Sequence, residues 1–156
     1  MGASYPGKRW PPEHFVKLAM LLNKITDCIF VLIGSKKETS LAKTFEKLYP
    51  LNNVLNFVGK TNIEELPYLL KNLDLLVAPD TGVLYLAISL KIPTVSIFAL
   101  TDPKYVIPYQ DLENHRVVFN PEGLKYKNIK KRKRPLEPMK NISPELVFKE
   151  VKELLS

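Results

Sequence analysis

The sequence has a single cysteine, few glycines and no apolar run long enough to cross a membrane. A membrane-spanning helix needs about 18 or more consecutive apolar residues, and no run approaches that length. Cys28 cannot form an internal disulfide, so a reducing compartment is expected. Residues 1–12 lack the apolar core of a secretory signal peptide. We therefore expect a cytoplasmic protein.

Several common catalytic and nucleotide-binding patterns are also missing. His14 and His115 lie near no cysteine or carboxylate at metal-ligand spacing, so a zinc site is not expected. Ser4 and Ser35 have no evident histidine partner, which argues against a serine nucleophile. Neither the G-x-G-x-x-G fingerprint nor a Walker A sequence is present.

The composition is that of an ordinary globular domain with an excess of positive charge. The chain has 156 residues, of which 46% are hydrophobic and 25% charged, enough to bury a core in one domain. Its net charge of +7 suits an anionic partner. Nucleotide phosphate, nucleic acid and an acidic membrane surface all satisfy that condition, and the charge alone does not choose among them.

Short apolar runs alternate with helical patterns along the chain. Strands are predicted over residues 28–33, 54–58, 73–78, 94–98 and 116–119, and helices over residues 12–24, 38–49, 63–72, 82–90 and from Pro144 onward. This alternation predicts an α/β fold, a Rossmann-like and mostly parallel sheet with helices on both faces. Such a domain normally opens with a strand, whereas residues 1–11 form a loop. Either the first strand is missing or Met1 is an artificial start.

Three of the predicted strands end in small or polar residues. These ends are Gly34-Ser35, Gly59-Lys60-Thr61 and Pro79-Asp80-Thr81-Gly82. The carboxyl ends of parallel strands meet at one edge of the sheet, where ligands bind and helix N-termini offer free amides to anions. The N-terminal loop, with Ser4 and Lys8, would join them. The sequence therefore predicts a pyrophosphate-binding edge.

Each of these residues also has an ordinary structural interpretation. Asp80 could simply cap the helix that starts at Gly82, and Lys8 could be a surface charge. Trp10 is better interpreted as a packing anchor than as a stacking platform. Glu38 could have no role beyond placing a negative charge at a helix N-terminus.

Residues 121–141 are polar, proline-marked and strongly basic, and we interpret them as a surface loop. Seven cations lie within Lys125–Arg134, but only Tyr126 is interleaved, so base stacking on nucleic acid is poorly provided for. A solvated loop and contact with an anionic membrane surface are the other interpretations. The alternative function is thus a non-catalytic α/β module that binds nucleic acid or another anionic partner through this loop.

Several motifs follow one another in order between residues 2 and 108. They are Gly2-Ala3-Ser4, Lys8-Arg9-Trp10-Pro11, Leu32-Ile33-Gly34-Ser35 with Glu38, Phe57-Val58-Gly59-Lys60-Thr61 with Glu65-Leu66, Asp80-Thr81-Gly82-Val83-Leu84-Tyr85-Leu86-Ala87, Pro93, Phe98-Ala99-Leu100-Thr101-Asp102-Pro103 and Pro108. Together these motifs resemble the ADP-heptose:lipopolysaccharide heptosyltransferase family.

The resemblance implies that residues 1–156 are a single Rossmann-like domain, the C-terminal donor-binding half of a two-domain GT-B glycosyltransferase. It implies that Ser4 and Lys8 meet the donor pyrophosphate, that Glu38 holds the ribose and that Asp80-Thr81-Gly82 line the phosphate–sugar cleft. It also implies an ADP-sugar donor and no metal cofactor. The predicted donor-binding set is Ser4, Lys8, Gly34, Glu38, Lys60, Asp80, Thr81, Gly82 and Tyr85.

The chain departs from the family pattern in places. Tyr85 stands where the family usually has histidine, and Ala99 replaces a usual glycine. The family's N-terminal acceptor domain, with its proposed carboxylate base, has no counterpart here. The catalytic residue is therefore expected outside this chain, which would bind donor without completing transfer to the lipopolysaccharide core. Such a protein would be cytoplasmic and peripheral to the inner membrane.

Overall fold

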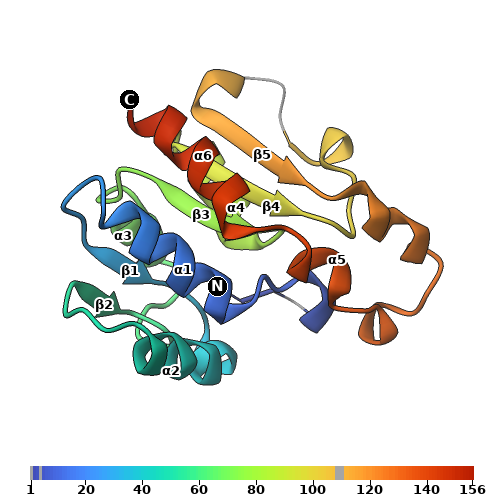
Figure 1. The fold of residues 1–156 in the computed structure, drawn as a ribbon, viewed down its shortest axis with the longest axis horizontal. Helices are drawn as coiled ribbons and strands as arrows, with labels where there is room; N and C mark the ends of the chain where they lie inside the picture. Colours follow the sequence, from blue (N-terminus) through green and yellow to red (C-terminus); the bar gives the residue numbers. More distant parts are fainter. Residues whose placement is uncertain (1, 4, 108–110) are drawn as a thin grey trace.

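The computed structural model describes residues 2–3, 5–107 and 111–156. Within them the chain forms an α/β fold in which every strand runs parallel to the strands it pairs with (Figure 1). The strands are β1 (Phe30–Leu32), β2 (Val54–Asn56), β3 (Leu76–Pro79), β4 (Thr94–Phe98) and β5 (His115–Phe119). They pair in two groups: β1 with β2, and β4 with β3 on one side and β5 on the other.

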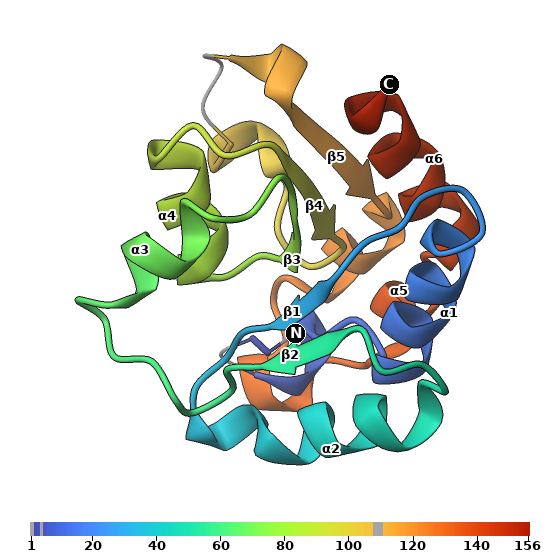
Figure 2. The same ribbon diagram turned by 90° about the vertical axis from the view of Figure 1, so that its left-hand side faces the viewer.

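Helices cover both faces of the strands (Figure 2). One core cluster joins strand residues to α1 (Pro12–Leu22), α2 (Thr39–Leu48), α5 (Glu137–Lys140) and α6 (Pro144–Leu155). A second core cluster joins other strand residues to α3 (Leu66–Leu70) and α4 (Gly82–Ser89). Short 3-10 turns connect these elements at Pro6–Lys8, Lys36–Glu38, Pro103–Tyr105, Leu112–Asn114, Pro121–Tyr126 and Lys131–Lys133.

The prediction of a mostly parallel sheet with helices on both faces is confirmed. Strand β4 occupies its predicted range, whereas β1, β2 and β3 are shorter than predicted. Helix α3 covers only residues 66–70 of the predicted 63–72. The sheet is also divided. In the described part of the chain β1 and β3 are not hydrogen-bonded to each other, so the strands form a pair and a triplet.

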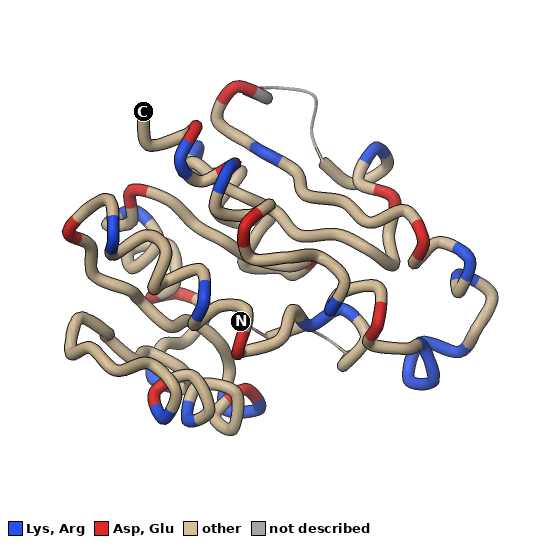
Figure 3. The backbone as a smooth tube through the Cα atoms, in the orientation of Figure 1, with Lys and Arg blue, Asp and Glu red and all other residues tan. Residues whose placement is uncertain are grey.

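The prediction that residues 121–141 form a surface loop is wrong in part. The segment contains a 3-10 turn and α5, and Gly123, Pro138 and Met139 are buried. Met139 belongs to the core cluster of α1 and α6, and the side-chain amide of Asn120 donates to the Pro138 carbonyl oxygen (2.9 Å). The many charges in this segment hid two apolar residues that pack inward. Residues 125 and 127–133 are exposed, as expected. Their lysine and arginine residues form a blue cluster in Figure 3.

Trp10 fastens the N-terminal segment to the C-terminal one. Its side chain is almost fully buried, and its Nε1 donates a hydrogen bond to the Ile142 carbonyl oxygen (2.8 Å). Its ring packs edge-on against Phe15 with the centroids 4.8 Å apart. The interpretation of Trp10 as a packing anchor is confirmed. Because Lys8 lies only two residues upstream, this anchor also fixes the loop that enters the site.

Replacing Trp10 with phenylalanine tests the anchor. Trp10→Phe keeps an aromatic ring but leaves the buried Ile142 carbonyl without its donor, which costs roughly 1–3 kcal/mol. We expect the free energy of unfolding, measured by urea denaturation, to fall by about that amount. Tyr68→Phe, at a position that is 75% exposed, is the control and should change little. An unchanged stability for Trp10→Phe would contradict the assignment.

Candidate functional site

The carboxylate of Asp80 is the centre of a polar cluster at the carboxyl end of β3. It accepts hydrogen bonds from the Nζ of Lys8, from the hydroxyl of Tyr85 (2.6 Å) and from the hydroxyl of Thr101 (2.8 Å). Lys8 belongs to the N-terminal loop, Tyr85 to α4, and Thr101 follows β4. One side chain therefore ties together segments that are far apart in the sequence.

The cluster is largely shielded from solvent, since the side chains of Asp80 and Lys8 are only 11% and 18% exposed. Burial alone would raise the pKa of Asp80, but the hydrogen bonds from Lys8, Tyr85 and Thr101 outweigh it and hold the pKa below its usual value. Burial, together with the Asp80 carboxylate, raises the pKa of Tyr85. Tyr85 therefore stays protonated at neutral pH and remains a hydrogen-bond donor.

The start of α4 lies beside this carboxylate. The hydroxyl of Thr81 accepts a hydrogen bond from the Leu84 amide (3.4 Å), so Thr81 and not Asp80 is the N-cap. The interpretation of Asp80 as the cap is therefore wrong: its oxygens are engaged by Lys8 and two hydroxyls. A Cβ atom placed at Gly82 would meet no atom within 4 Å. The Gly82 and Val83 amides precede the first hydrogen bonds of the helix, so they are available to an anion there.

Glu38 caps a helix N-terminus, which is one of the two roles that the sequence suggested for it; the other is contact with a ribose. Its Oε2 accepts hydrogen bonds from the amide (2.7 Å) and the hydroxyl (2.6 Å) of Ser35, which closes a capping box. Gly2 packs closely on this side chain, because a Cβ at Gly2 would lie 2.0 Å from the Glu38 Cγ. Contact between Glu38 and a ribose stays a prediction.

A cavity of about 1750 Å³ opens between the two groups of strands and reaches this edge. It brings together most of the predicted set, namely Lys8, Gly34, Glu38, Asp80, Thr81, Gly82 and Tyr85. Lys60 is exposed and is not among the lining residues, because it follows β2, the outer strand of its pair. Its role stays a prediction. Ser4 and Pro108 lie outside the described residues.

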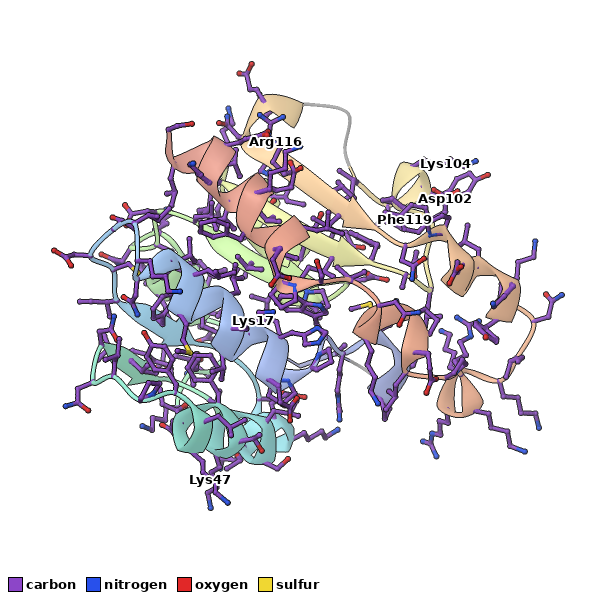
Figure 4. All side chains as sticks on the ribbon, in the orientation of Figure 1. Lys17, Lys47, Asp102, Lys104, Arg116 and Phe119 are labelled. Carbon is purple, nitrogen blue, oxygen red and sulfur yellow. The ribbon has the colours of Figure 1, made fainter. Side chains whose placement is uncertain are left out.

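Thr101 is a member of the cluster that the sequence placed in a family motif but not in the predicted donor-binding set. It lies three residues beyond Phe98, where β4 ends, at the same sheet edge as Asp80, and this position is the signal that could have found it. The next residue, Asp102, turns the chain: its carboxylate accepts from the Lys104 amide (3.1 Å) and pairs with the Lys104 Nζ (3.4 Å). Both side chains are labelled in Figure 4.

The described residues contain no group of three or more His, Cys, Asp or Glu side chains that could hold a metal ion. None of the helices in residues 2–3, 5–107 and 111–156 combines the length and the apolar character that crossing a bilayer requires.

The chain matches the family model of glycosyltransferase family 9 (heptosyltransferase) over residues 1–137. It therefore belongs to that family, and the resemblance noted in the sequence is confirmed. It is 29% identical to lipooligosaccharide heptosyltransferase 2 of Haemophilus influenzae, with 99% of this chain and 46% of that protein covered. It is 28% identical to lipopolysaccharide heptosyltransferase 2 of Salmonella typhimurium, with 99% and 45% covered. The chain thus spans less than half the length of these relatives.

Solved structures show the same fold. The Escherichia coli ADP-heptose lipopolysaccharide heptosyltransferase II superposes with a TM-score of 0.79 at 24% identity, covering 99% of this chain and 44% of that one. The family 9 glycosyltransferase of Veillonella parvula gives the same values. An E. coli heptosyltransferase solved with ADP gives a TM-score of 0.76 at 22% identity, covering 98% and 42%. The fold is accordingly that of the matched part of these GT-B heptosyltransferases.

The lowered pKa of Asp80 predicts how stability depends on pH. The stabilisation is fully present above the ordinary aspartate pKa of about 4 and is lost as the pH falls through the lower folded value. We expect the difference in Tm between the native chain and Asp80→Asn to be largest near pH 7 and to shrink toward about pH 3. Asp74→Asn, at an exposed position, is the control and should change Tm little. A difference independent of pH would contradict the assignment.

Proposed function

We propose that this chain binds the nucleotide-sugar donor of a heptosyltransferase, an ADP-heptose-like molecule, at the edge where β1, β3 and α4 meet. The observation that carries the proposal is the Asp80 cluster, which holds a cation, Lys8, beside the uncrowded start of α4 at Gly82. Relatives named as lipopolysaccharide heptosyltransferases, and related structures solved with ADP and with ADP-2-deoxy-2-fluoro heptose, support this donor class.

Each part of the site has a role in the proposal. The donor diphosphate meets the Lys8 ammonium and the first amides of α4, and no side chain at Gly82 obstructs its approach. Glu38, held by Ser35, faces the ribose. During transfer negative charge develops on the departing ADP, and the same cation and amides stabilise it. The proposal requires no metal ion.

We propose that residues 1–156 bind the donor only and do not activate the acceptor. The relatives are more than twice as long as the part that this chain matches. We place the base that activates the lipopolysaccharide-core acceptor in a region other than these residues. Residues 1–156 alone then bind donor without transferring heptose.

We further propose that the basic segment, residues 125–134, contacts an anionic membrane surface. Its cations, apart from Arg134, are exposed. Arg134 anchors the segment to the N-terminal loop by donating to the Tyr5 hydroxyl (3.2 Å), three residues from Lys8. This position would hold a cytoplasmic protein at the membrane, close to a lipid-linked acceptor. Nucleic-acid binding through the same segment remains the alternative.

Nucleotide binding by calorimetry and thermal shift tests the donor site. ADP at about a hundred times its Kd should stabilise the chain by about 2.7 kcal/mol, more than AMP or GDP at the same concentration. Lys8→Ala should weaken ADP binding by about tenfold or more, because a charge-assisted hydrogen bond contributes roughly 1.5–3 kcal/mol. Gly82→Ala should also weaken binding while leaving Tm unchanged or higher, since its methyl group enters open space.

Ser89→Ala, at an exposed position on the same helix, is the matched control for Gly82→Ala and should bind ADP as the native chain does. If both Lys8→Ala and Gly82→Ala bind ADP with native affinity, the donor does not lie at this edge.

The membrane contact is tested by replacing Lys130, Lys131, Arg132 and Lys133 with glutamine. Each basic residue near an anionic surface contributes about 1 kcal/mol. We expect binding to vesicles that contain anionic lipid to fall by roughly a hundredfold or more, and ADP binding to persist. The matched control replaces the exposed Lys24, Lys43, Lys47 and Lys71, with Lys47 labelled in Figure 4 on another part of the surface.

If the control set loses vesicle binding equally, net charge alone is responsible. If vesicle binding is absent in the native chain while mixed-sequence RNA binds through Lys130–Lys133, the nucleic-acid alternative replaces the membrane contact.

A further inference from the structure

Two segments that are distant in the sequence meet beside the donor site. The 3-10 turn Pro6–Lys8, dark blue in Figures 1 and 2, lies against α5 and against the end of the basic segment. The contact is close at the level of the backbone, because a Cβ at Gly7 would lie 3.3 Å from the carbonyl oxygens of Arg134 and Pro135. The end of the basic segment therefore rests on the loop that carries Lys8.

Arg134 holds this part of the basic segment together. Its Nη2 donates to the Lys127 carbonyl oxygen (2.6 Å), and its Nε donates to the Ile129 carbonyl oxygen (3.1 Å). Its Nη1 donates to the Tyr5 hydroxyl (3.2 Å). A guanidinium carries its donors in one rigid plane, so it can serve acceptors that come from different parts of the chain. One side chain thus joins the basic segment to the N-terminal loop.

Tyr5 continues the connection from Arg134 to Lys8. Its side chain is buried, with only 7% of its surface exposed. The Lys8 Nζ lies 5.5 Å from the centroid of the Tyr5 ring, within the range of a cation–π contact. The Lys8 amide also donates to the Tyr5 carbonyl oxygen (3.1 Å), which closes the turn. Tyr5 therefore contacts both the backbone and the ammonium of Lys8.

The Lys8 side chain needs such support because its stem is long and flexible. It loses rotamer freedom when its ammonium binds Asp80. Neighbours that restrict the stem before a ligand arrives reduce this entropic cost, and such preorganisation raises affinity. Tyr85 and Thr101 bond to the carboxylate and not to the lysine. Tyr5, in contrast, contacts the ammonium itself.

We propose that Arg134 is a positioning residue of the donor site, which acts through Tyr5 to hold the Lys8 ammonium against Asp80. The inference rests on the proposed function, because it assigns a part in donor binding to a residue that does not touch the donor. Neither Arg134 nor Tyr5 lines the cavity. The end of the basic segment then supports the donor site, in addition to any contact that its exposed cations make.

Two substitutions break the connection at different points. Tyr5→Phe keeps the ring beside Lys8 and removes only the hydroxyl that accepts from Arg134, and Arg134→Gln removes the guanidinium. Burial tends to raise the pKa of Asp80, and the hydrogen bond from Lys8 is the largest of the contributions that lower it. We therefore expect both variants to raise the pKa of Asp80, followed without nucleotide through the NMR shift of its carboxyl carbon.

Affinity for ADP, measured by calorimetry, is the second readout. We expect each variant to bind ADP roughly threefold to tenfold more weakly than the native chain, the size of effect found for residues that act through others. In a Lys8→Ala background, Arg134→Gln should cause little further loss, because the residue through which it acts is gone. Lys140→Gln removes the same charge at an exposed position on α5. It is the matched control and should change neither readout.

An unchanged Asp80 pKa in both Tyr5→Phe and Arg134→Gln would overturn the proposal. An equal loss of ADP affinity from Arg134→Gln with and without Lys8 would also overturn it, because the role of Arg134 would then be purely structural. A matching effect of Lys140→Gln would overturn it by assigning the change to net charge. A native chain that does not bind ADP contradicts the proposed function itself, and the two failures are distinguishable because the Asp80 titration uses no nucleotide.

Discussion

The buried carboxylate of Asp80 is the interaction on which the site depends. Removing a carboxylate from water is costly unless charge and hydrogen bonds replace the water. Lys8, Tyr85 and Thr101 supply those bonds, and they come from the N-terminal loop, from α4 and from the end of β4. The constraint that stabilises Asp80 therefore also places a lysine beside the start of α4.

Much of the fold could be predicted because its signals are local. β4 is buried along its whole length, and Ser143 caps α6 by accepting from the Leu146 amide (3.4 Å). The division of the sheet had no such signal, since strand pairing depends on residues distant in the sequence. The inward packing of Met139 was hidden for a related reason, because one apolar residue among many charges forms no periodic pattern.

The candidate site followed from one geometric rule, that parallel strands end at a common edge. That rule placed Gly34, Asp80 and Gly82 together, as the structure does. It could not assign partners. The bonds from Lys8 and Thr101 to Asp80 span 72 and 21 residues, so the sequence alone could not distinguish a capping aspartate from one that holds a lysine. The rule does not hold for Lys60, which follows β2. Strand β1 lies between β2 and the cavity, so Lys60 does not line it.

The central claim is that a nucleoside diphosphate binds at the Asp80 edge, and an amide NMR titration of the chain with ADP tests it most directly. The account predicts progressive shifts at Gly34, Gly82 and Val83, which border the cavity, and none in residues 125–133. Shifts confined to residues 125–133, or no shifts at saturating ADP, would contradict it.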